Sequence, residues 1–363
     1  MGIEIKRLLR GKIPDKYIEA MARKGITLRD LLTMSEMELA EELCVDRDAA
    51  KEILKVVSHH LIEPVTADEL LRMRRVLLRT GIEELDNLLG GGFQLGTING
   101  IYGPPASGKT QLCLHLTSKS LLSEGLGGLS SEEAFFIDTE GSFSPHRMLT
   151  FLLGNGLRED DLSRVRVLSA PGPHQLRIAL RLALESVKEG RSKFICIDSI
   201  SYPFRGYKGL SDLPERQAGM KEALSLLRRI VEHEALSIIT IHAIRWGREV
   251  ISKGGFVLGH VPHNMLYLRR VKGDVVIVTL EDSSYLPSGQ AAFRITEEFA
   301  HCPVVASIVR LCEALSRRVI PRNHSKDIIR LARKWVVKSM CETTDTSTLS
   351  QGNEDEAVLS QQL

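Results

Sequence analysis

The fold of this chain is decided by residues 97–122, which read TINGIYGPPASGKTQLCLHLTSKSLL. Within this stretch, residues 103–110 match the pattern G-x-x-x-x-G-K-[ST] in full, between a strand-like run and a leucine-rich, helix-like run. A strand, a glycine-rich turn and a helix in this order let backbone N–H groups turn inward and cradle phosphate oxygens. The pattern therefore predicts a phosphate-binding loop inside an α/β fold.

The residue types of this loop each have a chemical use. Lys109 is placed to reach the β- and γ-phosphates of a nucleoside triphosphate, and the Thr110 hydroxyl is placed to bind Mg²⁺. A chance match by a Gly- and Pro-rich turn is the alternative, and the flanking strand and helix patterns argue against it. The residues expected to bind the nucleotide are Gly103, Pro104, Pro105, Ala106, Ser107, Gly108, Lys109, Thr110 and Gln111.

Two further apolar runs end in carboxylates. The run FICID ends at Asp198, which is the candidate for a second, metal-facing acid beside Thr110, with an ordinary helix N-cap as the alternative. The run FIDTE ends at Glu140, whose carboxylate could take a proton from an attacking water. We therefore expect Glu140 and Lys109 to be catalytic, and Thr110 and Asp198 to lie on the metal side of the site.

Composition is that of an ordinary soluble globular protein. The chain has 363 residues, of which 43% are hydrophobic, and its 48 Lys and Arg against 46 Asp and Glu give a net charge of +2. This balance excludes a uniformly basic nucleic-acid coat and is compatible with a local basic patch. No apolar run approaches the roughly 20 residues of a membrane span, and the N-terminus has no apolar signal-peptide core. The six scattered cysteines form no C-x-x-C pair, which favours a reducing, intracellular compartment.

Apolar residues recur at helical spacing through residues 1–60, which resemble a small helix-hairpin-helix bundle. Ser35 followed by Glu38 is a capping-box pattern, and Asp46 can cap the next helix. Cys44 stands where a hairpin glycine is expected. Such a bundle either contacts a nucleic-acid backbone or serves as a docking module.

The rest of the chain changes pattern three times. Residues 61–79 are a basic linker interrupted by Pro64. Residues 80–300 alternate strand and helix patterns, which predicts an α/β domain with a mainly parallel sheet and antiparallel last strands. Residues 301–340 form a basic amphipathic helical extension, with nine Lys and Arg against two acids, and residues 341–363 form a disordered acidic tail by composition. The basic run in the extension either lengthens a DNA path or is a solvated helix face.

A series of motifs follows in the order and spacing of one family. The motifs are LDNLLGGG, GKTQLC, FFIDTEGSF, IDSIS, GGFVLGH, LYLRR and EDSSYLPSGQAAFRITEE. They resemble the RecA/RadA recombinases, above all the archaeal RadA type and the eukaryotic recombinases with their paralogues. The resemblance covers roughly residues 10–300 and includes the N-terminal helical unit. The resemblance implies a RecA-like P-loop ATPase core, ATP and Mg²⁺ as cofactors, and DNA-dependent ATPase activity.

The resemblance also implies roles for residues outside the phosphate-binding loop. Arg147 would stack on the adenine. Asp282 and Pro287 would belong to a segment that caps the nucleotide of a neighbouring subunit. Two loops would bind DNA, with cations on phosphates and aromatic rings on unpaired bases. Their expected DNA-binding residues are Arg205, Lys208 and Arg216 in the first loop and Arg245, Trp246 and Arg248 in the second. Routine solvated charges are the alternative for the first loop, and Trp246 anchored on the core is the alternative for the second.

The chain departs from the family pattern at several places, and two of them bear on nucleotide sensing and on assembly. A strand of the family ends in an Asn-Gln pair whose Gln senses the γ-phosphate, and the matching residues here are His242 and Ala243, of which alanine cannot form that hydrogen bond. The linker of a filament-forming member carries a Phe that inserts into the next subunit, and Pro64 stands at that position here.

These departures favour a recombinase paralogue that binds ATP and single-stranded DNA and assists strand exchange in homologous recombination and double-strand-break repair. An orthodox strand-exchange recombinase, a non-catalytic ATP-binding assembly adaptor and a RecA-fold ATPase outside recombination are the alternatives. The expected partners are single-stranded DNA and other RecA-fold recombinase subunits, in a homo-oligomer or short filament, with no membrane. The expected location is intracellular: the nucleus in a eukaryote, and the cytoplasm or nucleoid in an archaeon.

Overall fold

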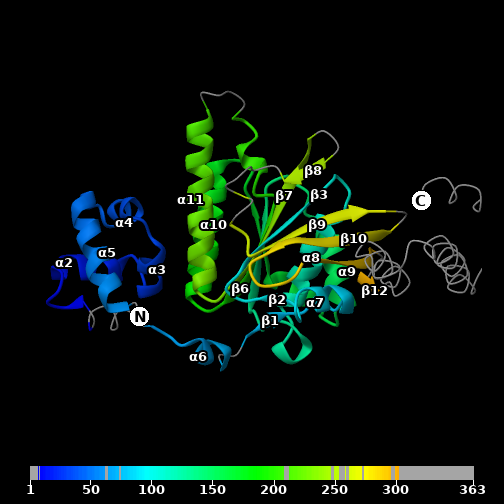
Figure 1. The fold of residues 1–363 in the computed structure, drawn as a ribbon, viewed down its shortest axis with the longest axis horizontal. Coiled ribbons are helices and arrows are strands. Elements are labelled where there is room, and N and C mark those ends of the chain that lie inside the picture. The colour runs from blue at the N-terminus through cyan, green and yellow to red at the C-terminus, as the bar shows by residue number, and fades with distance from the viewer. Residues whose placement is uncertain are drawn as a thin grey trace, which may run out of the picture. The chain divides into compact units, whose positions relative to one another are not determined.

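Figure 1 shows the chain in a computed structural model. The structure describes residues 7, 9–61, 64–72, 75–207, 212–246, 249–252, 258, 261–271, 274–295 and 299–301. The expected acidic tail at 341–363 lies outside these residues, and so does the expected basic extension at 301–340 beyond its first residue.

A group of helices with its own core opens the chain. These helices are α2 (Asp15–Arg23), α3 (Leu28–Thr33), α4 (Glu36–Leu43) and α5 (Arg47–Leu61). Their apolar faces bury Met21, Leu39 and Ile53 together in one hydrophobic cluster. Burial of one apolar stripe per helix holds such a small bundle together, because helices this short are marginal alone.

The helix caps in this bundle are those that the sequence predicts. The Ser35 hydroxyl accepts from the backbone N–H of Glu38, whose carboxylate accepts in return from the Ser35 backbone. The Asp46 carboxylate accepts from the N–H of Ala49 at 2.7 Å. Cys44 ends α4 with φ 55° and ψ 48°, the left-handed conformation that glycine adopts most easily. This backbone conformation explains why a glycine is expected at the position.

The ion cluster around Asp30 of α3 joins the helical bundle to the α/β part. The carboxylate is fully buried and lies 2.6 Å from the Lys188 ammonium and 3.1 Å from the Arg229 guanidinium. Burial alone raises the pKa of Asp30, but the His233 hydrogen bond and the charges of Lys188 and Arg229 hold that pKa well below its usual range. The ionised carboxylate is therefore stabilised at this contact.

A short segment leads from the bundle to the α/β part. It contains the exposed helix α6 (Ala67–Arg72), inside the stretch that the sequence marks as a linker. The two-stranded sheet of β1 (Leu77–Leu78) and β2 (Phe93–Gln94) follows, with α7 (Glu83–Leu88) between its strands.

Among the described residues, ten strands form one mixed sheet in the order β12-β11-β10-β9-β3-β7-β6-β4-β5, with β8 beside β7. The strands β3, β4, β5, β6, β7 and β9 are mutually parallel, and the others pair antiparallel. The sequence prediction of an α/β fold with antiparallel last strands is confirmed. The strands are β3 (Ile98–Gly103), β4 (Glu133–Asp138), β5 (Val165–Ser169), β6 (Ser192–Asp198), β7 (Leu236–Trp246), β8 (Glu249–Ser252), β9 (Asn264–Arg270), β10 (Val275–Ser283), β11 (Gly289–Ile295) and β12 (Phe299–His301).

Helices cover both faces of this sheet (Figure 1). The pair α8 (Lys109–Ser120) and α9 (Pro145–Gly154) packs on one face, and the pair α10 (Pro173–Lys188) and α11 (Leu213–Glu232) packs on the other. Strands β3 and β4 are buried along their whole length, as expected for parallel strands with two covered faces. In the described connections, short 3₁₀ helices lie at Glu124–Leu126, Glu159–Arg164 and Tyr202–Phe204. Among the described residues, no helix is long and apolar enough to cross a membrane.

Strand β7 shows how the sheet sorts side chains between its faces. Leu236 and Ile238 pack in the cluster on the α8 face, whereas Ile239 and Ile241 pack in the cluster on the α11 face. Because side chains alternate along a strand, the next even-numbered side chain, that of Thr240, follows on the α8 face. This face carries the phosphate-binding loop at the carboxyl end of the strands.

Candidate nucleotide-binding site

The phosphate-binding loop connects β3 to α8, and its two flanking glycines fix its shape. A Cβ atom added at Gly103 would lie 2.2 Å from the Leu268 carbonyl oxygen, and one added at Gly108 would lie 2.4 Å from the Ile295 side chain. Gly108 also has φ 97°, in the left-handed region that favours glycine, directly before the first turn of α8. Space and backbone conformation both require glycine, and the loop ends at a helix N-terminus that attracts anions.

A hollow of about 350 Å³ lies against this loop. Residues 106–111 line it together with Arg270 and Ile295. The sequence places the loop residues there, but it does not assign the other two. Arg270 ends β9, which pairs in parallel with β3, so the strand pairing brings this cation beside the loop. The motif LYLRR was the available signal for Arg270.

Lys109 and Asp198 face each other across the same end of the sheet. The Lys109 ammonium donates to the carbonyl oxygens of Gly103 and Pro104 at 3.0 Å each. Burial lowers the pKa of Lys109, while the charges of Asp198 and Glu140 raise it. The lysine is thus held folded over its own loop.

The buried Asp198 carboxylate accepts hydrogen bonds from two threonines. The Thr110 hydroxyl donates to one oxygen at 2.5 Å, and the Thr240 hydroxyl donates to the other. Burial raises the pKa of Asp198, and these two hydrogen bonds lower it. The carboxylate therefore faces α8 and β7, and the structure brings together the hydroxyl and carboxylate that the sequence predicts on the metal side.

Glu140 lies on a loop that the Asp138 carboxylate organises. The Asp138 carboxylate accepts from the backbone N–H groups of four successive residues, Glu140, Gly141, Ser142 and Phe143, at 2.9–3.1 Å. This role of Asp138 was not predicted from the sequence, although an aspartate at a strand end shortly before a glycine is a usual loop-organising signal. The loop presents the Glu140 side chain toward the carboxyl end of β7.

His242 of β7 meets Glu140. The imidazole Nε2 lies 2.7 Å from the Glu140 Oε1. Ala243 instead packs against the hydrophobic cluster on the opposite face of the sheet. The sequence analysis places Ala243 at the position that senses the nucleotide, but in the structure the side chain on the nucleotide face is that of His242.

Comparison with known proteins agrees with this geometry. A Rad51 family model matches residues 71–301, a span that contains the whole site described above. The chain belongs to the Rad51 family. The resemblance to RecA/RadA recombinases that the sequence motifs predict is thereby confirmed.

Two individual proteins are also similar to this chain. The DNA repair and recombination protein RadA of Aeropyrum pernix is 32% identical over 231 residues, which cover 61% of this chain and 71% of that protein. The DNA repair and recombination protein RadA of Metallosphaera sedula is 29% identical over 282 residues, which cover 74% of this chain and 87% of that protein.

Arg147 of this Rad51-family chain joins α9 to α8 at the edge of the loop. Its Nε donates to the Gln111 side chain at 2.6 Å, and its guanidinium lies 4.2 Å from the centre of the Phe151 ring. Both predicted nucleotide-binding residues, Arg147 and Gln111, are thus in contact. Stacking of Arg147 on an adenine stays a prediction.

Asp282 and Pro287 lie away from the phosphate-binding loop of their own chain. Asp282 pairs with Met265 near the start of β9, whereas Arg270, which ends β9, lies beside the loop. Asp282 and Pro287 are both exposed. The structure therefore does not bring them into this chain's own site, and their expected role at the nucleotide of a neighbouring subunit stays a prediction.

The predicted DNA loops are described only in part. Arg205 is exposed, with its guanidinium 4.8 Å from the centre of the Tyr202 ring, and Arg216 lies in the first turns of α11. Arg245 and Trp246 belong to β7 by backbone, and their side chains lie outside the description. Lys208 and Arg248 lie outside the described residues.

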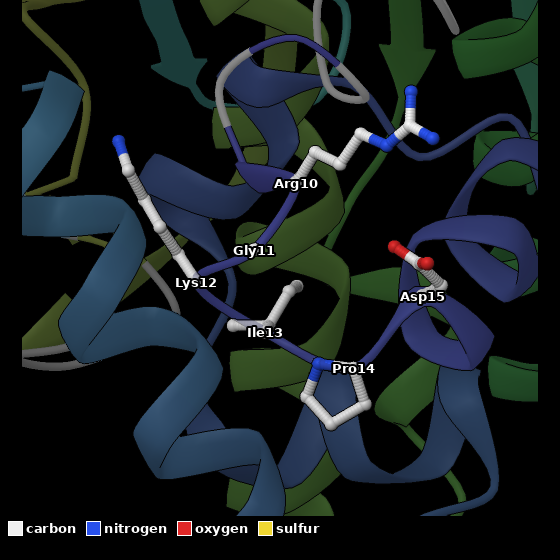
Figure 2. Close-up of a pocket in the computed structure, with 6 residues that line it drawn as sticks. All are labelled: Arg10, Gly11, Lys12, Ile13, Pro14 and Asp15. Atoms are coloured by element: carbon white, nitrogen blue, oxygen red, sulfur yellow. The ribbon is translucent and has the colours of Figure 1, made fainter.

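A second hollow, of about 540 Å³, is formed by residues 10–15. Figure 2 shows the side chains of Arg10 and Lys12 extending away from each other. Among the described residues, no group of three or more His, Cys, Asp or Glu side chains could hold a metal ion. Because the side chains around this hollow do not converge, we assign no site to it.

Proposed function

We propose that this Rad51-family protein is a DNA-dependent ATPase of homologous recombination and DNA double-strand-break repair. The convergence of Lys109, Asp198 and Glu140 at one end of a parallel sheet carries the proposal. The names of the two RadA relatives, both DNA repair and recombination proteins, support the biological setting.

The residues of the loop fit ATP with Mg²⁺. The two glycines let the loop pack closely against Leu268 of β9 and Ile295 of β11. The Thr110 hydroxyl with the Asp198 carboxylate is an all-oxygen donor set, which suits Mg²⁺. Bound ATP would supply the γ-phosphoryl group, and Mg²⁺ would neutralise part of its charge. Lys109 would exchange the two carbonyl oxygens that it now contacts for phosphate oxygens.

Glu140 would accept the proton of the attacking water. Its loop is fixed by the Asp138 carboxylate, so the base is carried by an ordered backbone. A positioned general base contributes about 10²–10⁴ in rate. A non-catalytic adaptor is less well supported, because the lysine, the metal-side pair and the base all lie together.

The DNA-binding part of the proposal rests on two loops. They follow β6 and β7, and both strands end at the edge of the sheet that carries the phosphate-binding loop. Cations there would contact phosphates and Trp246 would stack on a base. We further propose that the chain is a recombinase paralogue that assists strand exchange, because Pro64 stands at the position of the family's aromatic anchor.

The ATPase proposal is tested by turnover with and without single-stranded DNA, for the wild type and Glu140→Gln. Glutamine keeps the shape of the side chain but cannot accept the proton, so we expect turnover to fall about 10²-fold or more. ATP affinity should stay within a few-fold.

Glu132→Gln is the matched control, because Glu132 is an exposed glutamate directly before the same strand, β4. The turnover and the ATP affinity of Glu132→Gln should equal those of the wild type. Equal turnover of the wild type and Glu140→Gln would contradict the assignment of the base. Tight ATP binding without any turnover by the wild type would favour the adaptor.

A further inference from the structure

The side chain of His242 meets the proposed catalytic carboxylate from a neighbouring strand. Its Nε2 atom lies 2.7 Å from the Glu140 Oε1, and the two side chains are 20% and 28% exposed. The Nε2 atom is itself shielded from solvent. In the neutral imidazole this nitrogen can carry the proton and donate to a carboxylate, and in the charged form it always does.

The backbone that carries this imidazole is fixed on both sides. The His242 N–H donates to the Ser201 hydroxyl at 3.2 Å, in the segment that follows β6. On the other side, His242 is in register with Gly103, the first residue of the phosphate-binding loop. Glu140, by contrast, lies on a loop beyond the end of β4. A side chain on a rigid strand can therefore set the position of one on a loop.

The alternation along β7 makes this contact specific to one residue. Thr240, which donates to Asp198, and His242, which meets Glu140, are two residues apart and share a face. Ile241 and Ala243 share the opposite face, in the cluster packed against α11. The same strand thus supplies one contact to the metal-side acid and one to the base.

The strand also continues into the β7–β8 hairpin. Ala243, next to His242, pairs with Ser252, and Trp246 pairs with Glu249. Four residues of one strand therefore separate the imidazole from the tip of the loop that is proposed to bind DNA. A change at the hairpin would therefore reach the His242 side chain along its own strand and, through that side chain, the Glu140 carboxylate.

We propose that His242 is a positioning residue that holds Glu140 in place and transmits the state of the β7–β8 hairpin to it. The inference rests on the proposed ATPase function and adds a residue to its site. His242 acts through Glu140, and no bond to the nucleotide is assigned to it. The assignment differs from the sequence-based expectation, which leaves this role vacant at Ala243.

The test is the turnover of His242→Ala and His242→Gln, each with and without single-stranded DNA. Loss of the imidazole leaves Glu140 mispositioned, so we expect kcat of His242→Ala to fall about 10- to 100-fold. Its KM for ATP should change less than about threefold, and its stimulation by DNA should disappear. Glutamine keeps an N–H donor at about the reach of the imidazole Nε2, so His242→Gln should recover most of kcat.

Two further variants separate positioning from a general structural effect. Ala243→Ser is the matched control, because its side chain lies on the other face, and its kcat and DNA stimulation should equal those of the wild type. Adding His242→Ala to Glu140→Gln should cause no further loss, since the imidazole acts only through that carboxylate.

The outcomes distinguish this inference from the proposed function. Wild-type kcat and DNA stimulation in His242→Ala would overturn the inference and leave the ATPase proposal intact, provided that Glu140→Gln is inactive. Equal falls of His242→Ala and His242→Gln with a weakened ATP affinity would also overturn it, because that pattern indicates a damaged site. Full turnover of Glu140→Gln would overturn the proposed function itself.

Discussion

At the scale of single residues, Lys109 gives the sharpest test of nucleotide binding. Its ammonium now contacts two carbonyl oxygens of its own loop, and phosphate oxygens would replace them. A hydrogen bond to a charged group is worth about 1.5–3 kcal/mol, so Lys109→Ala should weaken ATP binding about tenfold or more. Titration with a fluorescent ATP analogue measures this loss.

The control for Lys109→Ala is Lys193→Ala, which removes a half-buried lysine at the amino end of β6, the opposite end of the parallel sheet. Its ATP affinity should equal that of the wild type. An unchanged affinity in a folded Lys109→Ala protein would contradict the assignment of the loop.

The sequence predicts some residues of the site better than others, for a physical reason. Residues 103–110 act through one continuous backbone, so their pattern is visible in the chain itself. Arg270 and His242 reach the site through strand pairing with β3, and nothing local to either residue reveals the register. A shift of one residue turns every side chain of a strand to the other face, so a match of the Asn-Gln pair to His242 and Ala243 does not by itself say which of the two side chains faces the loop.

At the scale of helices and strands, too, some elements could be predicted from the sequence and others could not. Long apolar strands such as β4 and β6 stand out by their β-branched and aromatic residues and were predicted. The six-residue helix α6 was not, because Pro64 dominated the interpretation of the segment as a linker. A signal was present, since Thr66 and Glu69 form a reciprocal capping box at the start of that helix.

The contact between α3 and α11 makes a prediction at this scale. Asp30 is fully buried between the cations of Lys188 and Arg229. Removing one partner of a buried ion pair costs about 3–5 kcal/mol, because the remaining charges lose their compensation. We therefore expect urea denaturation at pH 7 to show Asp30→Asn less stable than the wild type by about that amount.

The pH dependence of this difference follows from the lowered pKa of Asp30. A carboxyl whose pKa is lower in the folded state stabilises the protein above its unfolded pKa of about 3.9, and that stabilisation is lost as the pH falls. The difference in unfolding free energy should be constant from pH 7 to about pH 5 and should narrow below about pH 4.

The control for Asp30→Asn is Glu234→Gln in the same contact region, whose pair with Arg29 is exposed at both side chains. Exposed pairs contribute about 0–1 kcal/mol, so this variant should remain close to the wild type at every pH. An equal, pH-independent loss in both variants would contradict the assigned role of the Asp30 cluster.

At the scale of the whole molecule, the proposed association with another RecA-fold subunit concerns exposed groups at two places. Val65, Leu70 and Leu71 are exposed around α6, and Leu71 is 75% exposed. Asp282 and Pro287 are exposed away from the phosphate-binding loop of their own chain. Exposed apolar side chains like those around α6, and an exposed segment that could reach a neighbouring nucleotide, are both expected where one subunit contacts the next. Pro64, beside α6, offers no aromatic ring to such a contact.

We therefore expect the protein alone, with ATP and single-stranded DNA, to sediment as a monomer or short oligomer. We expect it to associate with another RecA-fold subunit only when ATP is present.

Pro64→Phe should strengthen self-association, because it adds a large apolar group at the interface. Leu71→Asp should weaken association, whereas Leu126→Asp, which changes an equally exposed leucine in a different connection, should have no effect. Long regular filaments formed by the unmodified protein alone would contradict the paralogue proposal. They would indicate an orthodox recombinase whose interface is anchored by Val65 or Leu70, since those side chains remain available where the aromatic residue is missing.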